Sequence, residues 1–217
     1  MVQLLATVLD VTLGDRNAML LAAGYAPAYG ERDLKAPELE HVRRALDFIL
    51  ERQEPYPALV VDGEWNIVNG NQGARRVFGL FPPGPTLPAQ HARNALHTVC
   101  HPDGLRRFIA NWEEFAGPLI QMIHREAAAG ANPAAARLRD ELLAYPGMPL
   151  RWKTPDPTAP VPPVLCMRLQ KDDVALAFFS TLTMLASPHD VTLEHLRIEC
   201  FYPGDRATED MARRLGA

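Results

Sequence analysis

The hydrophobic period of this chain changes twice, and the order of those changes limits its possible folds more than any other feature. Residues 37–53, PELEHVRRALDFILERQ, place apolar side chains on one face at helical spacing. Residues 57–71, PALVVDGEWNIVNGN, instead contain two β-rich runs around Asp62-Gly63, a pair suited to a tight hairpin turn. We therefore expect a β-hairpin directly after an amphipathic helix.

Helical spacing returns in the middle of the chain. We expect one long helix over residues 102–129, with a kink near Ala116 because Pro118 lies inside the pattern. Its apolar positions cover about half of the circumference, which is wider than a stripe that faces only a core. One side of this helix should therefore contact a partner subunit or a bound ligand. A further helix is expected over residues 133–147, ended by a Pro-Gly pair.

Three β-rich runs follow the proline-rich connector TPDPTAPVPP of residues 154–163. They are PVLCMRLQ, VALAFFSTLTML and VTLEHLRIECFY, which occupy residues 163–170, 174–185 and 191–202. In the last run, Leu196 and Ile198 alternate with Arg197 and Glu199, as in a strand with one buried face. The order predicts an α+β fold: a PAS-like antiparallel sheet of about five strands, covered by helices on one face.

The chain begins with two short helical stretches in residues 2–27, VQLLATVLDVTLGDRNAMLLAAGYAP. Helices of about three turns or less are marginal unless they pack on something. The formal net charge of −4 excludes a strong phosphate-binding surface for the chain as a whole. No apolar run approaches the roughly 18 residues of a membrane span, and no signal sequence is evident, so we expect a cytoplasmic protein without membrane attachment. The three cysteines form no CxxC pair, which suits a reducing compartment.

Several blocks resemble, in order, the MmyB-like (MltR-type) regulators of the Xre superfamily. These blocks are DRNAMLLAAGYAPAYGERDL, VRRALDFILERQEPYPALVVDGEWNIVNGN, HPDGLRRFIANWEEFA and FFSTLTMLASPHDVTLEHLRIECFYPGD. In that family, an N-terminal helix-turn-helix domain binds DNA and a C-terminal PAS-like domain senses a small ligand, with a fatty acid seen in the pocket of one member. The resemblance implies a ligand-sensing domain of a bacterial transcriptional regulator, which binds a fatty-acid-like or other apolar small molecule.

The resemblance also implies a division of the chain. Residues 1–35 resemble the C-terminal remnant of the helix-turn-helix domain, and residues 36–217 the PAS-like ligand-sensing and dimerisation domain. DNA would be bound through a helix-turn-helix domain that is largely missing from this chain, because its recognition helix would lie upstream. The alternative is that the protein no longer binds DNA directly. Helix-turn-helix regulators commonly work as two-fold dimers, so we expect a homodimer.

The segment HARNALHTVCH, residues 91–101, raises the question of a metal site, because His97 and His101 are four residues apart. A capping turn explains it better: His101 precedes a proline, where a helix is unlikely to continue, and Asp103 is placed to accept from the first helical amides. We expect no metal and no other cofactor.

Catalysis finds little support in the sequence. Ser180, Thr181 and Thr183 lie in a predicted strand without a nucleophile-elbow pattern, and no paired carboxylates or glycine-rich phosphate loop stand out. We expect no catalytic residues and no enzyme activity.

Aromatic residues of the predicted sheet and helices are the candidate walls of an elongated apolar pocket, although each can equally be ordinary core. The candidates are Trp65, Phe78, Phe108, Trp112, Phe115, Phe178 and Phe179. The polar group that orients an acyl ligand is left open among Arg106, Arg107, His101 and Thr181. The alternative function is a free-standing small-molecule or lipid carrier without direct DNA binding.

Overall fold

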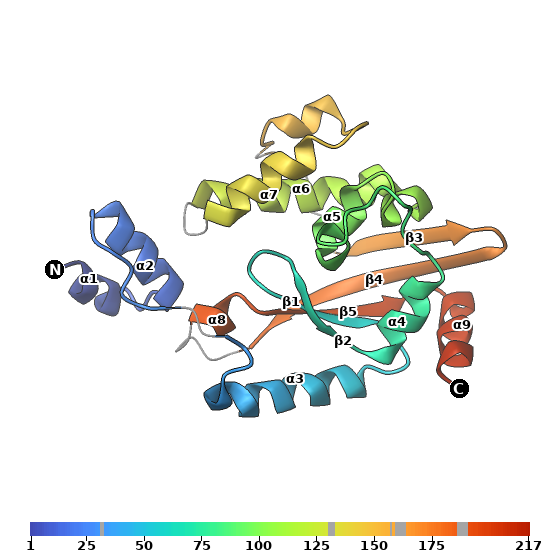
Figure 1. Ribbon diagram of the computed structural model, residues 1–217, viewed down its shortest axis with the longest axis horizontal. Coiled ribbons are helices and arrows are strands. Elements are labelled where there is room, and N and C mark those ends of the chain that lie inside the picture. The colour runs from blue at the N-terminus through green and yellow to red at the C-terminus, as the bar shows by residue number, and fades with distance from the viewer. Residues whose placement is uncertain (31–32, 130–132, 157, 159–163, 186–190) are drawn as a thin grey trace.

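The computed structural model describes residues 1–30, 33–129, 133–156, 158, 164–185 and 191–217 (Figure 1). Its centre is one antiparallel five-stranded sheet in the order β2-β1-β5-β4-β3, which confirms the predicted PAS-like α+β fold. The strands are β1 (Ala58–Val61), β2 (Ile67–Gly70), β3 (Leu165–Lys171), β4 (Val174–Met184) and β5 (Arg197–Pro203). The two strands of the N-terminal hairpin thus join the three C-terminal strands, through the pairing of β1 with β5.

Helices surround this sheet in the described part of the chain. The α-helices are α1 (Val2–Val8), α2 (Leu13–Ala22), α3 (Glu40–Arg52), α4 (Gln72–Gly79), α5 (Ala95–Cys100), α6 (Trp112–Ala129), α7 (Pro133–Leu143), α8 (Val191–Glu194) and α9 (Arg206–Gly216). Short 3-10 helices are η1 (Pro37–Leu39), η2 (His91–Arg93), η3 (Leu105–Phe108) and η4 (Leu150–Lys153). Among the described residues, no helix is both long enough and apolar enough to cross a membrane.

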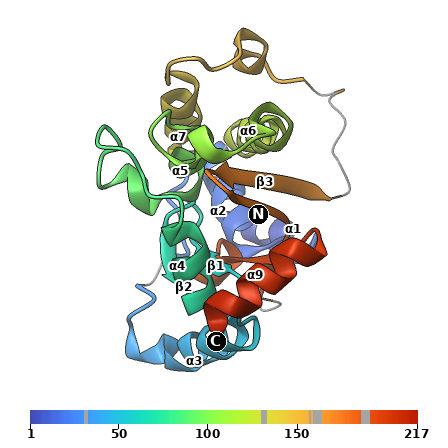
Figure 2. The ribbon, with the colours of Figure 1, turned by 90° about the vertical axis from the view of Figure 1, so that its right-hand side faces the viewer.

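Both faces of the sheet are covered, so the expectation of helices on one face only was wrong. Helices α5, α6 and α7 lie on one side of the sheet and α3 on the other (Figures 1 and 2). The reason is that β1 and β5 are apolar on both sides: Val60 and Ile198 pack with Leu46 of α3, whereas Val61 and Phe201 belong to the core under α6. Both faces of such a central strand are covered by other elements.

The predicted helix over residues 102–129 was wrong in its first turns. The α-helix α6 begins only at Trp112 and then runs through Pro118. Before it, the amide of Ala110 donates to the carbonyl of Arg168 at 2.8 Å, and Ile109 forms a bridge with Leu169. Backbone groups that bond to β3 cannot also bond along a helix, so residues 105–108 form a separate 3-10 helix.

The turn containing Asp103 also differs from the expectation. The Asp103 carboxylate accepts from the amide and the hydroxyl of Thr86, at 3.1 and 2.6 Å, rather than from the first amides of a helix.

Two strand boundaries differ from the sequence-based prediction. The last strand begins at Arg197, because residues 191–194 form α8 and bury Leu193 and Leu196 against α3. The hairpin turn is a loop: the Asp62 carboxylate accepts from the amides of Glu64 and Asn66, both at 2.9 Å, and β2 starts only at Ile67. Within the predicted connector 154–163, residues 157 and 159–163 lie outside the described residues.

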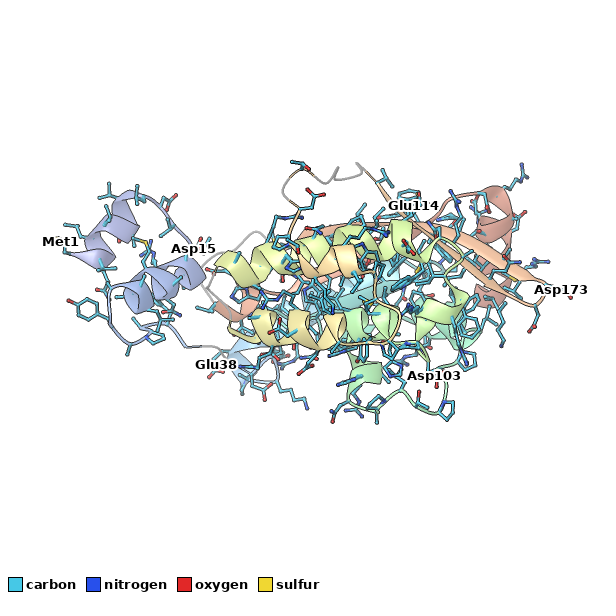
Figure 3. The ribbon with its side chains drawn as sticks, turned by 90° about the horizontal axis from the view of Figure 1, so that it is seen from above. Met1, Asp15, Glu38, Asp103, Glu114 and Asp173 are labelled. Atoms are coloured by element: carbon cyan, nitrogen blue, oxygen red, sulfur yellow. The ribbon has the colours of Figure 1, made fainter. Side chains whose placement is uncertain are left out.

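The N-terminal helices α1 and α2 lie at one end of the molecule, where Figure 3 labels Met1 and Asp15; Asp173, between β3 and β4, marks the opposite end. The hydroxyl of Thr12 caps α2 by accepting from the amide of Asp15 at 3.2 Å. The Glu194 carboxylate of α8 also accepts from two α2 amides, Leu13 at 2.7 Å and Gly14 at 2.8 Å. These bonds connect α2 to the segment that leads directly into β5.

Candidate functional site

A cavity of about 660 Å³ lies between the sheet and the helices α4, α5 and α6. The sheet supplies Leu59, Ile67 and Phe201 to its wall, and the helices supply Phe78 and Phe115. The volume is typical of a site for one small organic molecule, and so is the predominance of apolar side chains.

Trp65 forms part of this wall in a constrained backbone conformation. It is only 2% exposed and has a φ of 66°, a region that bulky residues rarely adopt. Its carbonyl accepts from the amide of Ala95 at 2.9 Å, and its indole N–H donates to Glu126 at 3.2 Å. The guanidinium of Arg197 lies over the ring, 4.5 Å from its centroid, and pairs with the same Glu126 at 2.8 Å. These contacts fix the indole against the cavity.

The structure brings three of the seven candidate aromatic residues to the cavity: Trp65, Phe78 and Phe115. Phe178 belongs to the same apolar core but lies outside the lining, and Phe108 packs against Phe81 with their ring centroids 5.5 Å apart.

The other two candidates lie elsewhere. Trp112 packs on Trp152 and donates its indole N–H to the carbonyl of Val99 at 2.9 Å. Phe179 alternates with Phe178 along β4, so it projects to the opposite sheet face, where it stacks on Tyr202.

None of the four polar candidates lines the cavity. Arg106 donates to the carbonyls of Pro146 and Gly147, both at 2.7 Å, and its guanidinium stacks on Trp112 at 3.8 Å. Arg107 donates to the carbonyl of Pro82 at 2.8 Å. His101 accepts from the amide of Asp103 at 3.0 Å, and Thr181 is exposed on the opposite sheet face. Each thus has a local structural role or faces solvent.

None of the polar groups that do line the cavity was among the sequence-based candidates for ligand binding. They are Asn69, Asn71, Arg75, Thr98, Ser180 and Glu199. The alternation in the last strand predicts one buried face, opposite Glu199, but helices cover the side of Glu199 too, and its side chain is half-buried. Burial raises the pKa of Glu199 to about 7, while a hydrogen bond from Ser180 acts in the opposite direction. The sequence held one signal: Phe201, two residues later, shares the face of Glu199.

A second polar cluster, outside the cavity lining, involves η2, α5 and α7. The Tyr145 hydroxyl bonds with the Nδ1 atoms of His97 and His91, at 2.7 and 2.8 Å, and the Nε2 atom of His97 lies 3.2 Å from Glu141. Burial, with a smaller effect of His91, lowers the pKa of His97 to about 4. Burial also raises the pKa of Tyr145 to about 12.

This cluster contains the residues that could hold a metal ion in the described ranges: His91, His97 and Glu141, whose ligand atoms lie within 4.8 Å of one another. The two imidazole rings are stacked in parallel, with centroids 3.9 Å apart and planes inclined by 4°. Because nitrogen lone pairs lie in the ring plane, parallel rings cannot both point at one ion without rotating. The geometry favours a hydrogen-bonded network, and the absence of a metal stays a prediction.

Comparison with known proteins identifies a family. Residues 42–215 match the family described as the MmyB-like transcription regulator ligand binding domain. The match covers all five strands and begins within α3. No curated protein matches the chain.

Proposed function

We propose that this chain, which belongs to the family of MmyB-like transcription regulator ligand-binding domains, senses a small molecule. The proposed ligand is fatty-acid-like or otherwise apolar and binds in the cavity under α4–α6. The observation that carries the proposal is the cavity itself: about 660 Å³, lined mainly by aliphatic and aromatic side chains. Burial of an alkyl chain there is favourable by about 0.8 kcal/mol for each CH₂ group removed from water. Catalysis forms no part of the proposal.

Strand β5 supports a route from the cavity to the N-terminal helices. Phe201 of β5 contributes to the cavity wall, and α8 ends three residues before the strand begins. Glu194, at the end of α8, accepts from the first amides of α2. A ligand that favours one position of β5 would therefore also favour one position of α2, which is a shift between two populated states.

The proposed output is DNA binding by a two-fold dimer. Helices α1 and α2 resemble the last helices of a helix-turn-helix domain, and residues 1–35 would be its C-terminal part. In a dimer, the spacing between two DNA-binding units sets which half-sites they reach together. Ligand occupancy would change that spacing. A carrier without DNA binding is the alternative, and a DNA mobility-shift assay with the protein separates the two.

The first test is native mass spectrometry of the purified protein, followed by denaturing extraction and identification of any bound compound. The variant Ala95→Phe places a ring in the cavity, because Ala95 is part of its lining. Ala175→Phe is the matched control, since Ala175 is exposed on β4 and outside the lining. We expect Ala95→Phe, but not Ala175→Phe, to lose the bound apolar compound. Retention by both variants would place the ligand elsewhere and refute the proposal.

A further inference from the structure

We propose that the cavity selects ligands whose polar end donates a hydrogen bond or carries a positive charge, and that Glu199 is the group that receives this end. Within the fatty-acid-like and other apolar molecules of the proposed function, the class comprises long-chain amines, alcohols and amides, with a primary ammonium as the best match, and it excludes free fatty acids. The inference rests on the proposed ligand-sensing function and assigns the chemistry of the ligand's polar end.

The position of Glu199 in the sheet is the first argument. Glu199 lies in the central strand, directly opposite Leu59 of β1 and Leu182 of β4 in the strand register. All three residues line the cavity. The half-buried side chain of Glu199 therefore lies on the cavity face between Leu59, which is also half-buried, and Leu182, which is 47% exposed. Partial removal of this carboxylate from water raises the free-energy cost of its charge unless a partner compensates for it.

The partners of Glu199 are the second argument. Ser180, its diagonal neighbour on β4, provides a hydrogen bond. None of the ion pairs among the described residues includes Glu199. A bound ligand could therefore supply the charged partner that Glu199 does not find among the described residues.

Two arginines are the cations that could compensate the charge of Glu199. Arg197 shares the strand face of Glu199 but pairs with Glu126 and stacks on Trp65. Arg75 is the other charged residue of the cavity lining, and its side chain is exposed on α4. Neither contributes to the raised pKa of Glu199, which burial causes. Near neutral pH, a proton thus neutralises much of this carboxyl group in the ligand-free protein.

The chemistry of a matching ligand follows from this state. An ammonium group can replace the proton: the carboxyl group releases H⁺ to solvent, and the resulting carboxylate pairs with the cation at the partly apolar wall of the cavity. A hydroxyl or amide N–H can donate to the same oxygen atoms. A ligand carboxylate would instead bring a second acid beside the first, which disfavours ionisation of both. Glu199 therefore distinguishes ligands by the chemistry of their polar ends and not by their alkyl chains.

The test compares three probes with the same chain: decylammonium, decanol and decanoate. Their affinities for the full chain are measured by calorimetric titration at pH 8, below the concentration at which the probes aggregate. We expect decylammonium to bind at least about tenfold more tightly than decanoate, a difference of about 1.4 kcal/mol. At pH 6, binding of decylammonium should release protons, seen as a heat that depends on the ionisation enthalpy of the buffer.

The variants assign the preference to Glu199. Glu199→Gln keeps the shape and removes the charge, and should reduce the ratio of decylammonium to decanoate affinity to about one. Glu64→Gln is the control, because Glu64 is exposed and outside the cavity lining. Ser180→Ala removes the hydrogen-bond partner but keeps the carboxyl group, so it should retain the preference for decylammonium.

The outcomes separate the two proposals. Equal or tighter binding of decanoate by the wild type, or a preference unchanged in Glu199→Gln, overturns the role of Glu199 and leaves ligand sensing intact. If none of the three probes binds and extraction yields no apolar compound, ligand sensing in this cavity fails, and the inference fails with it.

Discussion

The Nδ1 atom of His97 lies 2.7 Å from the hydroxyl oxygen of Tyr145. The same hydroxyl lies 2.8 Å from Nδ1 of His91, whose ring stacks on that of His97. A phenol donates one hydrogen bond, so in the neutral cluster one Nδ1 accepts from Tyr145 and the other donates to it. The cluster joins η2 and α5 to the end of α7, and therefore holds the layer of helices above the cavity.

The first prediction concerns stability in acid. Because the pKa of His97 is lowered to about 4 in the folded protein, the unfolded state binds more protons between about pH 6.5 and pH 4. The stabilisation is therefore present at pH 7 and is lost as the pH falls through this window. We expect His97→Gln to lose about 2 kcal/mol less free energy of unfolding than the wild type between pH 7 and pH 4.5. Urea denaturation at both pH values measures this, and identical losses would refute it.

The second prediction concerns Glu199 in the ligand-free protein. A carboxyl group with a raised pKa stabilises the fold below its unfolded pKa, and that contribution disappears as the pH rises through about 7. Glu199→Gln should therefore be about 2 kcal/mol more stable than the wild type at pH 8 and similar to it at pH 4. Thermal unfolding at the two pH values checks this, and a variant less stable at pH 8 would contradict it.

The third prediction separates Arg106 from its neighbour. Arg106 donates to two carbonyls of the Pro146-Gly147 turn and stacks on Trp112, whereas Arg107 donates to one carbonyl and is exposed. A lysine cannot reproduce the planar two-pronged contact. Arg106→Lys should lower the free energy of unfolding by about 1–2 kcal/mol, and the control Arg107→Lys by less than about 0.5 kcal/mol. Chemical denaturation compares the two, and equal effects would refute the assignment.

The fourth prediction concerns the contact between α8 and α2. Removal of the carboxylate in Glu194→Ala leaves the amides of Leu13 and Gly14 without their partner. Hydrogen exchange should become about tenfold faster in residues 13–22 while β1 and β5 stay protected. Asp173→Ala, in the turn between β3 and β4, should change neither region. Unchanged exchange in α2 would show that this contact does not hold the helix.

Much of the architecture could be predicted from the sequence. The alternation in β4 and the helical spacing in α3 are local patterns. Each shows which side chains face the core and which face solvent. Trp65, Phe78 and Phe115 were singled out as possible cavity walls because they are large and apolar. The cavity contains them, but nothing local distinguished them from Phe108 or Trp112, which pack against other rings.

The sequence by itself determined the order of the main elements and the family, because these depend on periodicity or on residues close together in the chain. Only the tertiary structure decided which sheet face became the cavity wall. Alternation places Glu199 and Ile198 on opposite faces but does not say that both faces are covered. It could not join His91 to Tyr145 either, because 54 residues separate them. Long-range packing sets such contacts. Here the packing of helices on the second sheet face places Glu199 of β5 in the cavity wall.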